Sequence, residues 1–277
     1  MVSFKISQAL WLAFLIIGVT NADIAEKTAA GKTILINELN TDQPSSDTLE
    51  YIELYNTSPW DIIMDNYTLV LYNGKAELTA YTMITLDGHC ISALGYFLIG
   101  SPSMTNPTPN IKFTRPRNSI QNGEATSCDG VGLYNGDSGD LNAANLVDFI
   151  AYSIYASQTD AGPFYPDYLP QNAIAIEDPA YGADDESLNR CNGNAVRDMT
   201  QFETRHLSPG TVNLCDGSLS PISVPPMASE NCGTNPCADA VLNNCDVNAE
   251  CSSGLDGSAN CTCKSGFVGN GTSCNVL

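Results

Sequence analysis

The uneven spacing of eleven cysteines most strongly constrains how this 277-residue chain folds. Cys90, Cys128, Cys191 and Cys215 are far apart, whereas the other seven lie between residues 232 and 274. A segment that short cannot bury a sufficient hydrophobic core and depends on disulfides, while a longer segment can build its own core. The spacing therefore predicts a large domain followed by a small, disulfide-stabilised one, in an oxidising compartment.

The N-terminal residues indicate that compartment independently. Lys5 precedes an apolar run from Ala9 to Val19, and Thr20-Asn21-Ala22 follows as a small-residue exit. The run is shorter than the roughly 20 residues of a membrane-spanning helix. We predict a signal peptide over residues 1–22 and a secreted, extracellular protein. No later segment is as apolar, so no membrane span is expected.

The chain is strongly acidic. Without Lys5, 10 basic residues stand against 31 acidic ones, a formal charge of −21. Such a surface repels nucleic acid and anionic lipid, and it attracts basic partners or divalent cations. The simpler interpretation is that the charge serves solubility.

Alternating apolar residues predict strands. In Glu50–Asn56, Tyr51, Glu53 and Tyr55 alternate with Ile52 and Leu54, which predicts one face on a core and the other toward water. Together with Thr33–Asn40 this run predicts two strands joined by a loop. Further strand-like runs are Tyr67–Tyr72, Tyr81–Leu86, Gly95–Ile99, Val131–Tyr134 and Leu146–Tyr152. Turn residues separate them, Asn73-Gly74 being the clearest hairpin signal. The pattern predicts an all-β sandwich with antiparallel pairing.

Composition also predicts the domain boundaries. Residues 23–30 form a polar leader, and 31–215 hold the predicted sandwich. Within it, 153–185 has little alternation and is expected to be a long decorated loop. Residues 216–232, rich in Pro and Ser, predict a linker, and 233–277 form the cysteine-rich module.

Several motifs in the large domain resemble those of a lamin-tail domain, in the family's order. They are Ile36-Asn-Glu-Leu39, Glu50-Tyr-Ile-Glu-Leu-Tyr-Asn56, Asn66-Tyr-Thr-Leu69, Gly95-Tyr-Phe-Leu-Ile99, Val147-Asp-Phe-Ile150, Glu186-Ser-Leu-Asn-Arg190 and Ser208-Pro-Gly-Thr-Val-Asn213. The resemblance implies an immunoglobulin-like sandwich without catalytic chemistry. It places Glu38, Glu50 and Glu53, which would otherwise suggest acid–base work, at motif positions of a scaffold. This copy departs from the pattern in being long, cysteine-bearing and secreted, which excludes a nuclear-lamina role.

The C-terminal module resembles an epidermal-growth-factor-like (EGF-like) domain. Its signature is six cysteines with Cys261-Thr-Cys263, then Gly266, Phe267, Gly269 and a final Cys274. The resemblance implies the bridges Cys237–Cys251, Cys245–Cys261 and Cys263–Cys274. Calcium-binding members carry acidic residues before the first cysteine and Asp or Asn two residues after the third. Here Gly233–Pro236 and Ser253 occupy those positions, so no calcium site is expected in the module.

The cysteines outside this module leave alternatives open. We prefer Cys90–Cys128 and Cys191–Cys215, because each pair joins neighbouring segments. Cys232 then remains for a disulfide-linked dimer, and the alternatives are an unpaired thiol or a bridge to the sandwich.

Neither histidine has the neighbours of a catalytic residue. His89 follows the turn Asp87-Gly88 beside Cys90, and His206 follows Arg205 before a Pro-Gly turn. No zinc or nucleophile motif includes either, so no catalytic, cofactor or metal site is expected. Asp137–Asp140 and Asp184–Glu186 are expected to be a turn and a solvated loop that collect calcium weakly at most.

Glycosylation sequons occur at Asn56, Asn66, Asn260 and Asn270. Pro59 lowers the expectation for Asn56, and oxidation of Cys261 lowers it for Asn260. Asn270, in a turn, is the best candidate.

These features favour a non-catalytic, acidic, secreted protein that works in the extracellular matrix, adhesion or interaction. Its partners would be extracellular proteins or matrix polymers, or calcium and a mineral surface in a mineralised tissue. The alternative is a soluble EGF-type receptor ligand, although such ligands usually begin as membrane-tethered precursors. A secreted metal-dependent hydrolase is the remote alternative and requires an unrecognised metal site in the Asp-rich loops.

Overall fold

The computed structural model describes most of the large domain and much of the C-terminal module. The described residues are 34–43, 46–58, 61–75, 78–136, 141–177, 186–216, 237, 243–253 and 259–277. The predicted signal peptide and leader, and nearly all of the predicted linker, lie outside them.

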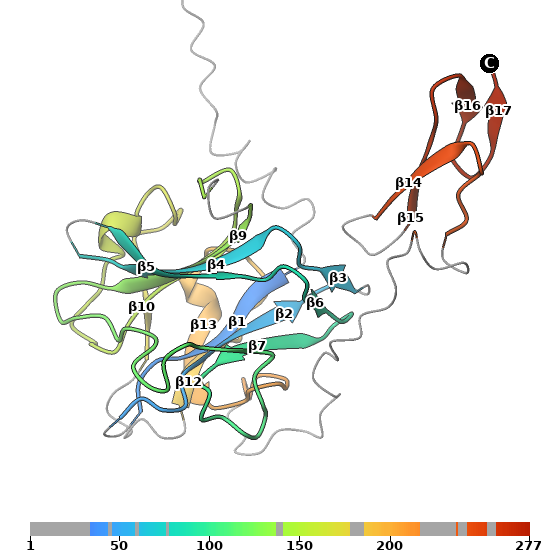
Figure 1. The fold of residues 1–277 in the computed structure, drawn as a ribbon. Helices are drawn as coiled ribbons and strands as arrows, with labels where there is room; N and C mark the ends of the chain where they lie inside the picture. The colour runs from blue at the N-terminus through green and yellow to red at the C-terminus, as the bar shows by residue number, and fades with distance from the viewer. Residues whose placement is uncertain are drawn as a thin grey trace, which may run out of the picture. The chain divides into compact units, whose positions relative to one another are not determined.

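Two β-sheets form the large domain, an immunoglobulin-like sandwich (Figure 1). The first sheet has the order β13 (Phe202–His206), β12 (Glu186–Arg190), β1 (Ile34–Asn40), β2 (Tyr51–Asn56), β7 (Tyr96–Gly100) and β8 (Ile111–Lys112). The second has the order β11 (Ala175–Ile176), β10 (Leu146–Ser153), β9 (Asp129–Asn135), β4 (Tyr67–Asn73) and β5 (Thr79–Thr85). A small ribbon pairs β3 (Ile62–Ile63) with β6 (Cys90–Ile91). The predicted all-β sandwich is therefore confirmed.

Pairing is antiparallel within each of the two large sheets except at one edge of each sheet. The predicted hairpin is present as β4 and β5, and its loop spans residues 74–78 because Asn73 pairs with Thr79. The two-residue strands β8 and β11 add in parallel, to β7 and β10 respectively. Their shortness explains why the sequence pattern did not predict them, since two residues carry no alternation.

The core lies between the two sheets. Apolar side chains with no exposed surface come from both, among them Ile36, Leu54, Leu69 and Phe149. Burying each such side chain contributes roughly 1.5–3 kcal/mol. This explains why the domain does not rely on dense disulfides.

The prediction that the second face of Glu50–Asn56 meets water is wrong. Tyr51 and Glu53 are 1% and 0% exposed, and Glu38 on β1 is 0% exposed. The segment after β13 covers this face. Ser208 Oγ and the Gly210 N–H donate hydrogen bonds to the Glu38 and Glu53 carboxylates respectively. Both faces of β1 and β2 are therefore interior.

The segment expected to be a decorated loop consists largely of turns and bends, and it also supplies core. Ala161, Phe164 and Leu169 are at most 1% exposed, around the 3-10 turn η1 (Gly162–Phe164). The Phe164 ring packs on Phe149 of β10 with centroids 4.9 Å apart. Aromatic burial of this kind needs no periodicity along the chain, so the alternation test did not detect it.

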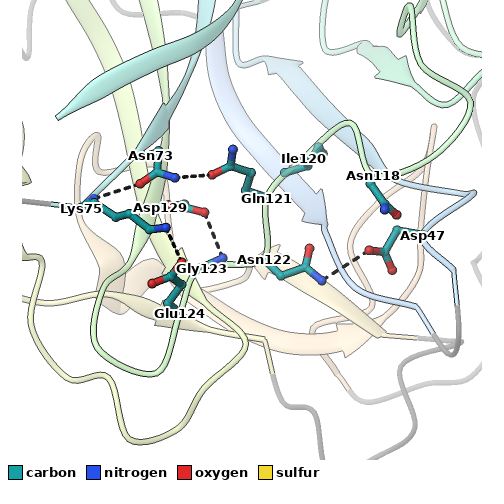
Figure 2. Close-up of a pocket in the computed structure, with 10 residues that line it drawn as sticks. All are labelled: Asp47, Asn73, Lys75, Asn118, Ile120, Gln121, Asn122, Gly123, Glu124 and Asp129. Carbon is teal, nitrogen blue, oxygen red and sulfur yellow. Dashed lines mark hydrogen bonds and ion pairs between the residues drawn. The ribbon is translucent and has the colours of Figure 1, made fainter. Parts of the chain in front are cut away.

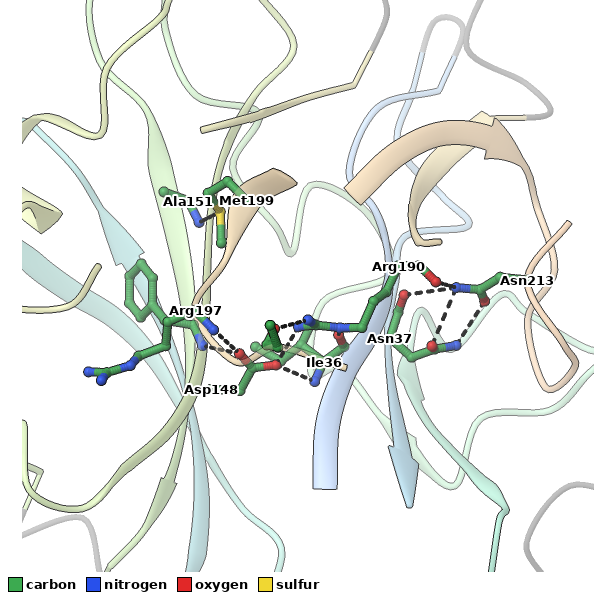
Figure 3. Close-up of polar contacts among 10 residues, drawn as sticks. Ile36, Asn37, Asp148, Ala151, Arg190, Arg197, Met199 and Asn213 are labelled. Atoms are coloured by element: carbon green, nitrogen blue, oxygen red, sulfur yellow. Dashed lines mark hydrogen bonds and ion pairs between the residues drawn. The ribbon is translucent and has the colours of Figure 1, made fainter. Parts of the chain in front are cut away.

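A buried ion pair connects the sheets (Figure 3). Arg190 Nη2 of β12 lies 2.6 Å from Asp148 Oδ2 of β10, and the side chains are 2% and 0% exposed. The same oxygen accepts the Ile36 N–H at 3.0 Å, and Asp148 Oδ1 accepts the Arg197 N–H at 2.7 Å. Arg190 Nε donates to the Ile36 carbonyl at 2.8 Å. The register shifts next to Ile36 in β1 and next to Asp148 in β10, so the contact joins two bulged strands.

The C-terminal module consists of two small ribbons. β14 (Ala249–Ser253) pairs with β15 (Ala259–Cys263), and β16 (Phe267–Gly269) pairs with β17 (Cys274–Val276). Asp246 joins them, because its carboxylate accepts the N–H groups of Asn248 at 2.8 Å and Cys274 at 3.1 Å. These hydrogen bonds, the Asn248 one first, lower the pKa of Asp246. Hydrogen bonds and disulfides thus take the place of a core.

The Arg190–Asp148 pair gives a test of what holds the sheets together. Arg190→Met leaves Asp148 buried without a partner, so we expect a loss of about 3–5 kcal/mol in unfolding free energy by urea titration. Arg205→Met is the matched control, because the Arg205 and Glu203 side chains are 36% and 33% exposed. It should cost about 0–1 kcal/mol. Equal costs for the two variants would contradict the role given to Arg190.

Candidate functional site

A polar pocket of about 400 Å³ opens on the sandwich (Figure 2). Three separate parts of the chain line it: the β1–β2 connection, the end of β4 with its loop, and the segment from residue 118 to the start of β9. The lining residues are Asp47, Asn73, Lys75, Asn118, Ile120, Gln121, Asn122, Gly123, Glu124 and Asp129. Amides and carboxylates dominate, and Ile120 is the one aliphatic residue among them.

Hydrogen bonds to its backbone hold the wall from residue 118 to 121 in place. Glu50, 0% exposed, accepts the N–H groups of Ser119 at 2.7 Å and Ile120 at 2.8 Å. The Gln121 N–H donates to Tyr81 Oη at 3.0 Å, and Tyr152 Oη donates to the Gln121 carbonyl at 2.7 Å. The side chains of this wall therefore project from a fixed main chain.

Asp129 joins the opposite wall to this segment. Its Oδ1 accepts the Gly74 N–H at 3.1 Å, and its Oδ2 accepts the Gly123 N–H at 3.0 Å. Gly123 has φ +74°, a conformation that L side chains rarely adopt, so glycine is required where the chain turns toward Asp129. Asn73 Nδ2 donates to Gln121 Oε1 at 2.7 Å, which fixes one amide against the other.

Asn122 closes the end of the pocket nearest Asp47. Its Nδ2 lies 2.9 Å from Asp42 Oδ1 and 3.4 Å from Asp47 Oδ2. Its Oδ1 is buried and accepts no hydrogen bond from any described residue. This acceptor therefore has no exposed surface to offer to a ligand.

Burial weakens the acidity of the carboxyl groups around the pocket. It is the main cause that raises the pKa of Asp129 and of Asp42, and the nearby Asp47 adds to the effect on Asp42. Burial also raises the pKa of Glu50 to about 7. Lys75 and Glu124 form an exposed ion pair at 2.6 Å across the mouth. The pocket therefore combines neutral amides with carboxyl groups that are already engaged.

The histidines and glutamates that the sequence analysis considered lie outside this pocket. His89 packs edge-on against Phe97, with centroids 5.4 Å apart, and His206 ends β13 opposite Glu186. Glu38 and Glu53 are direct cross-strand partners under the 207–215 segment. Burial raises the pKa of both, and Glu38 adds to the shift of Glu53.

The candidate cation loops fall largely outside the described residues. That holds for Asp137–Asp140, for Asp184 and Asp185, and for Gly233–Pro236 of the module. Among the residues that are described, no group of three or more His, Cys, Asp or Glu side chains is arranged to hold a metal ion.

The cysteines correct one expectation. Cys237–Cys251, Cys245–Cys261 and Cys263–Cys274 are bridged, in the pairing that the resemblance implies, and Cys191 is bridged to Cys215. The preferred pair Cys90–Cys128 is wrong. Cys128 is a free thiol buried in the core. Cys90 is disulfide-bonded to a residue outside the described ones. Proximity in sequence misled the prediction, because Cys90 lies in the β3–β6 ribbon whereas Cys128 directly precedes β9 of the second sheet.

The sequons differ in accessibility. Asn66, Asn260 and Asn270 are exposed. Asn56 is 0% exposed, and its Nδ2 donates to the carbonyls of Ile91 at 3.2 Å and Ser92 at 3.0 Å. The fold therefore leaves no room for a glycan on Asn56.

Sequence reasoning missed the pocket. Nothing in the sequence pattern connects Asn122-Gly123 or Asp129-Gly130 with Asp47 or Asn73. The one available signal was the density of amides in Asn118-Ser-Ile-Gln-Asn122, which by itself indicates only a loop.

Comparison with known families agrees with this architecture. The model of the Lamin Tail Domain matches residues 27–153, and that of an EGF domain matches residues 237–274. The chain carries a lamin tail domain followed by an EGF domain. The lamin-tail match ends with β10, while β12 and β13 complete the sheet that contains β1. A search of the curated proteins found no match.

The EGF domain and the disulfides are consistent with an extracellular protein that interacts with others. None of the helices in the described part of the chain has the length and apolar character needed to cross a membrane.

Glu177, next to this site, provides a test of the buried carboxyl groups. It is 4% exposed and accepts hydrogen bonds from Thr41, and burial raises its pKa from 4.5 to about 8. Between those pH values the folded chain holds a proton that the unfolded chain releases, so this group makes stability fall as pH rises. We expect the melting temperature to be about 5 °C higher at pH 5.5 than at pH 8.5.

Glu177→Gln keeps the shape and removes the titration, so the pH dependence should become shallower. Glu124→Gln is the matched control, since the Glu124 side chain is 51% exposed, and should follow the parent protein. Melting curves across the pH range give the comparison. An unchanged slope in Glu177→Gln would rule out the assignment.

The cysteines provide a further test. Cys232 is the one cysteine that the described residues do not include, and Cys90 has a bonded partner outside them. We expect peptide mapping without reduction to find Cys90 joined to Cys232 within one chain. The competing prediction is a disulfide-linked dimer through Cys232, which a dimer band that reduction dissolves would support.

Proposed function

We propose that this protein is a secreted, acidic, non-catalytic protein that binds extracellular proteins or matrix polymers. The carrying observation is the pairing of the two domains: a lamin tail domain with a hydrogen-bonded sandwich and an EGF domain held by three disulfides. The sandwich would present loops on a rigid frame, and the module would add a second contact surface. The acidity of the chain supports association with basic or cation-bearing surfaces.

Exposed apolar side chains on the module support a contact surface there. Val268 and Val276, on neighbouring strands β16 and β17, are 55% and 77% exposed, and Val247 is 85% exposed. Apolar groups that leave water on binding supply most of the free energy of protein association. The EGF domain is therefore the proposed protein-binding part.

The environment of Glu38 and Glu53 supports a structural rather than a catalytic role for their carboxyl groups. Glu38 receives hydrogen bonds from Tyr51, Ser187 and Ser208, and Glu53 from Asn37 and Gly210. Both are 0% exposed, so substrate has no access to them in this fold. This favours the interaction role over the remote alternative of a hydrolase.

Partition between deposited matrix and medium tests the proposal. The full-length protein, secreted by matrix-forming cells, should be found mainly in the insoluble matrix. Val268→Asp with Val276→Asp should lower that fraction about fivefold or more, because charge on the module opposes apolar contact. Val212→Asp on the sandwich, where Val212 is 53% exposed, is the matched control and should have no effect.

Two results would count against the proposal. Recovery of the protein in the medium, together with receptor phosphorylation at nanomolar concentration, would favour the soluble receptor ligand. A role in a mineralised tissue is the narrower form of the proposal, and equal recovery from mineral-free and mineralised matrix would exclude it.

A further inference from the structure

We propose that the pocket between Asp47, Gln121 and Asp129 binds a neutral, polyhydroxylated ligand, that is, a sugar unit of an uncharged glycan. This ligand class is an addition to the proposed extracellular role. It rests on that role only because an extracellular protein would encounter such glycans outside the cell.

The pocket offers both hydrogen-bond donors and acceptors. The Asn118 amide is exposed, so it offers both an N–H donor and an oxygen acceptor, and the Gln121 side chain is hydrogen-bonded through Oε1, which leaves its Nε2 as a donor. Figure 2 shows Asn73 directed at Gln121 and Lys75 directed at Glu124, with Asn118 farther along the segment that carries Gln121. A hydroxyl group donates one hydrogen bond and accepts two, so it matches such a mixed set.

Charged ligands fit the pocket less well. Three carboxyl groups against Lys75 repel phosphate and sulfate. A guanidinium or ammonium group only donates, so it would leave Gln121 Nε2 without an acceptor. A metal ion lacks available ligands, because both oxygens of Asp129 already accept backbone N–H groups and Glu124 is paired with Lys75. A neutral polyol is the class that remains.

The lining also argues against an apolar ligand. Small-molecule pockets are usually lined mostly by apolar and aromatic side chains, whereas here Ile120 alone is aliphatic and is only 2% exposed. Binding therefore depends on directional hydrogen bonds from a wall that the carboxylate of Glu50 and the hydroxyls of Tyr81 and Tyr152 hold in place. A wall already ordered before binding lowers the entropy cost of capturing a sugar.

Titration of the mature full-length protein with defined saccharides tests the inference. The neutral probes are cellotriose, chitotriose and maltotriose, and the charged probes are a sulfated heparin disaccharide, calcium chloride and tri-arginine. We expect at least one neutral trisaccharide to bind with a dissociation constant of about 0.1–10 mM, as a few neutral hydrogen bonds allow. The charged probes should bind at least about tenfold more weakly.

Two variants locate the binding. Asn118→Gly removes the amide and suits the positive φ of that residue, 50°. Gln121→Ala removes the second amide and leaves its hydrogen-bonded backbone in place. Each should weaken the neutral saccharide about fivefold or more, while Gln171→Ala, an exposed glutamine outside the pocket, should not. Unchanged melting temperatures would show that the variants fold.

The inference is overturned if no neutral probe binds below about 20 mM, or if both pocket variants bind as the parent does. Preferential binding of tri-arginine would overturn it in favour of a basic peptide, and preferential binding of calcium in favour of a cation. Because the titration uses purified protein, its result is separate from the matrix partition that tests the proposed function.

Discussion

The buried Arg190–Asp148 ion pair ties together the two sheets of the sandwich. It lies where β1 and β10 each carry a register shift, and at the β1 shift Asp148 accepts the Ile36 N–H while Arg190 donates to the Ile36 carbonyl. A shift of either strand by one residue would leave a charge and several N–H groups buried without partners. The pair therefore fixes the register of β1 and β10, and with it the positions of the loops that follow.

The outer face of β1 and β2 sets a second condition on the fold. Glu38 and Glu53 face away from the apolar core but not toward water, so the 207–215 segment must lie over them and donate hydrogen bonds. The Cys191–Cys215 disulfide joins the end of that segment to the end of β12. A covalent link at this point limits how far the cover can separate from carboxyl groups that cost free energy when buried.

The sequence predicts local features well, and it predicts contacts between residues far apart in the chain poorly. Alternation in Glu50–Asn56 and the turn at Asn73-Gly74 depend on neighbouring residues, and both strands and hairpin are present. The burial of Glu53 depends on a segment about 157 positions away, and the pocket on three separate segments. The disulfide of Cys90 shows the same limit. Six cysteines permit fifteen pairings, so the pairing of the module's cysteines was predicted from the family resemblance and not from their spacing.

The surroundings of Cys128 determine how reactive its thiol is. Cys128 directly precedes β9 and is 0% exposed, and burial raises the pKa of its thiol to about 12. The thiolate is the reactive form of cysteine, so the folded domain shields this one from oxidants and alkylating reagents. The other cysteines among the described residues are already bonded. Labelling of Cys128 would therefore report opening of the sandwich, and the protein contains its own reporter of unfolding.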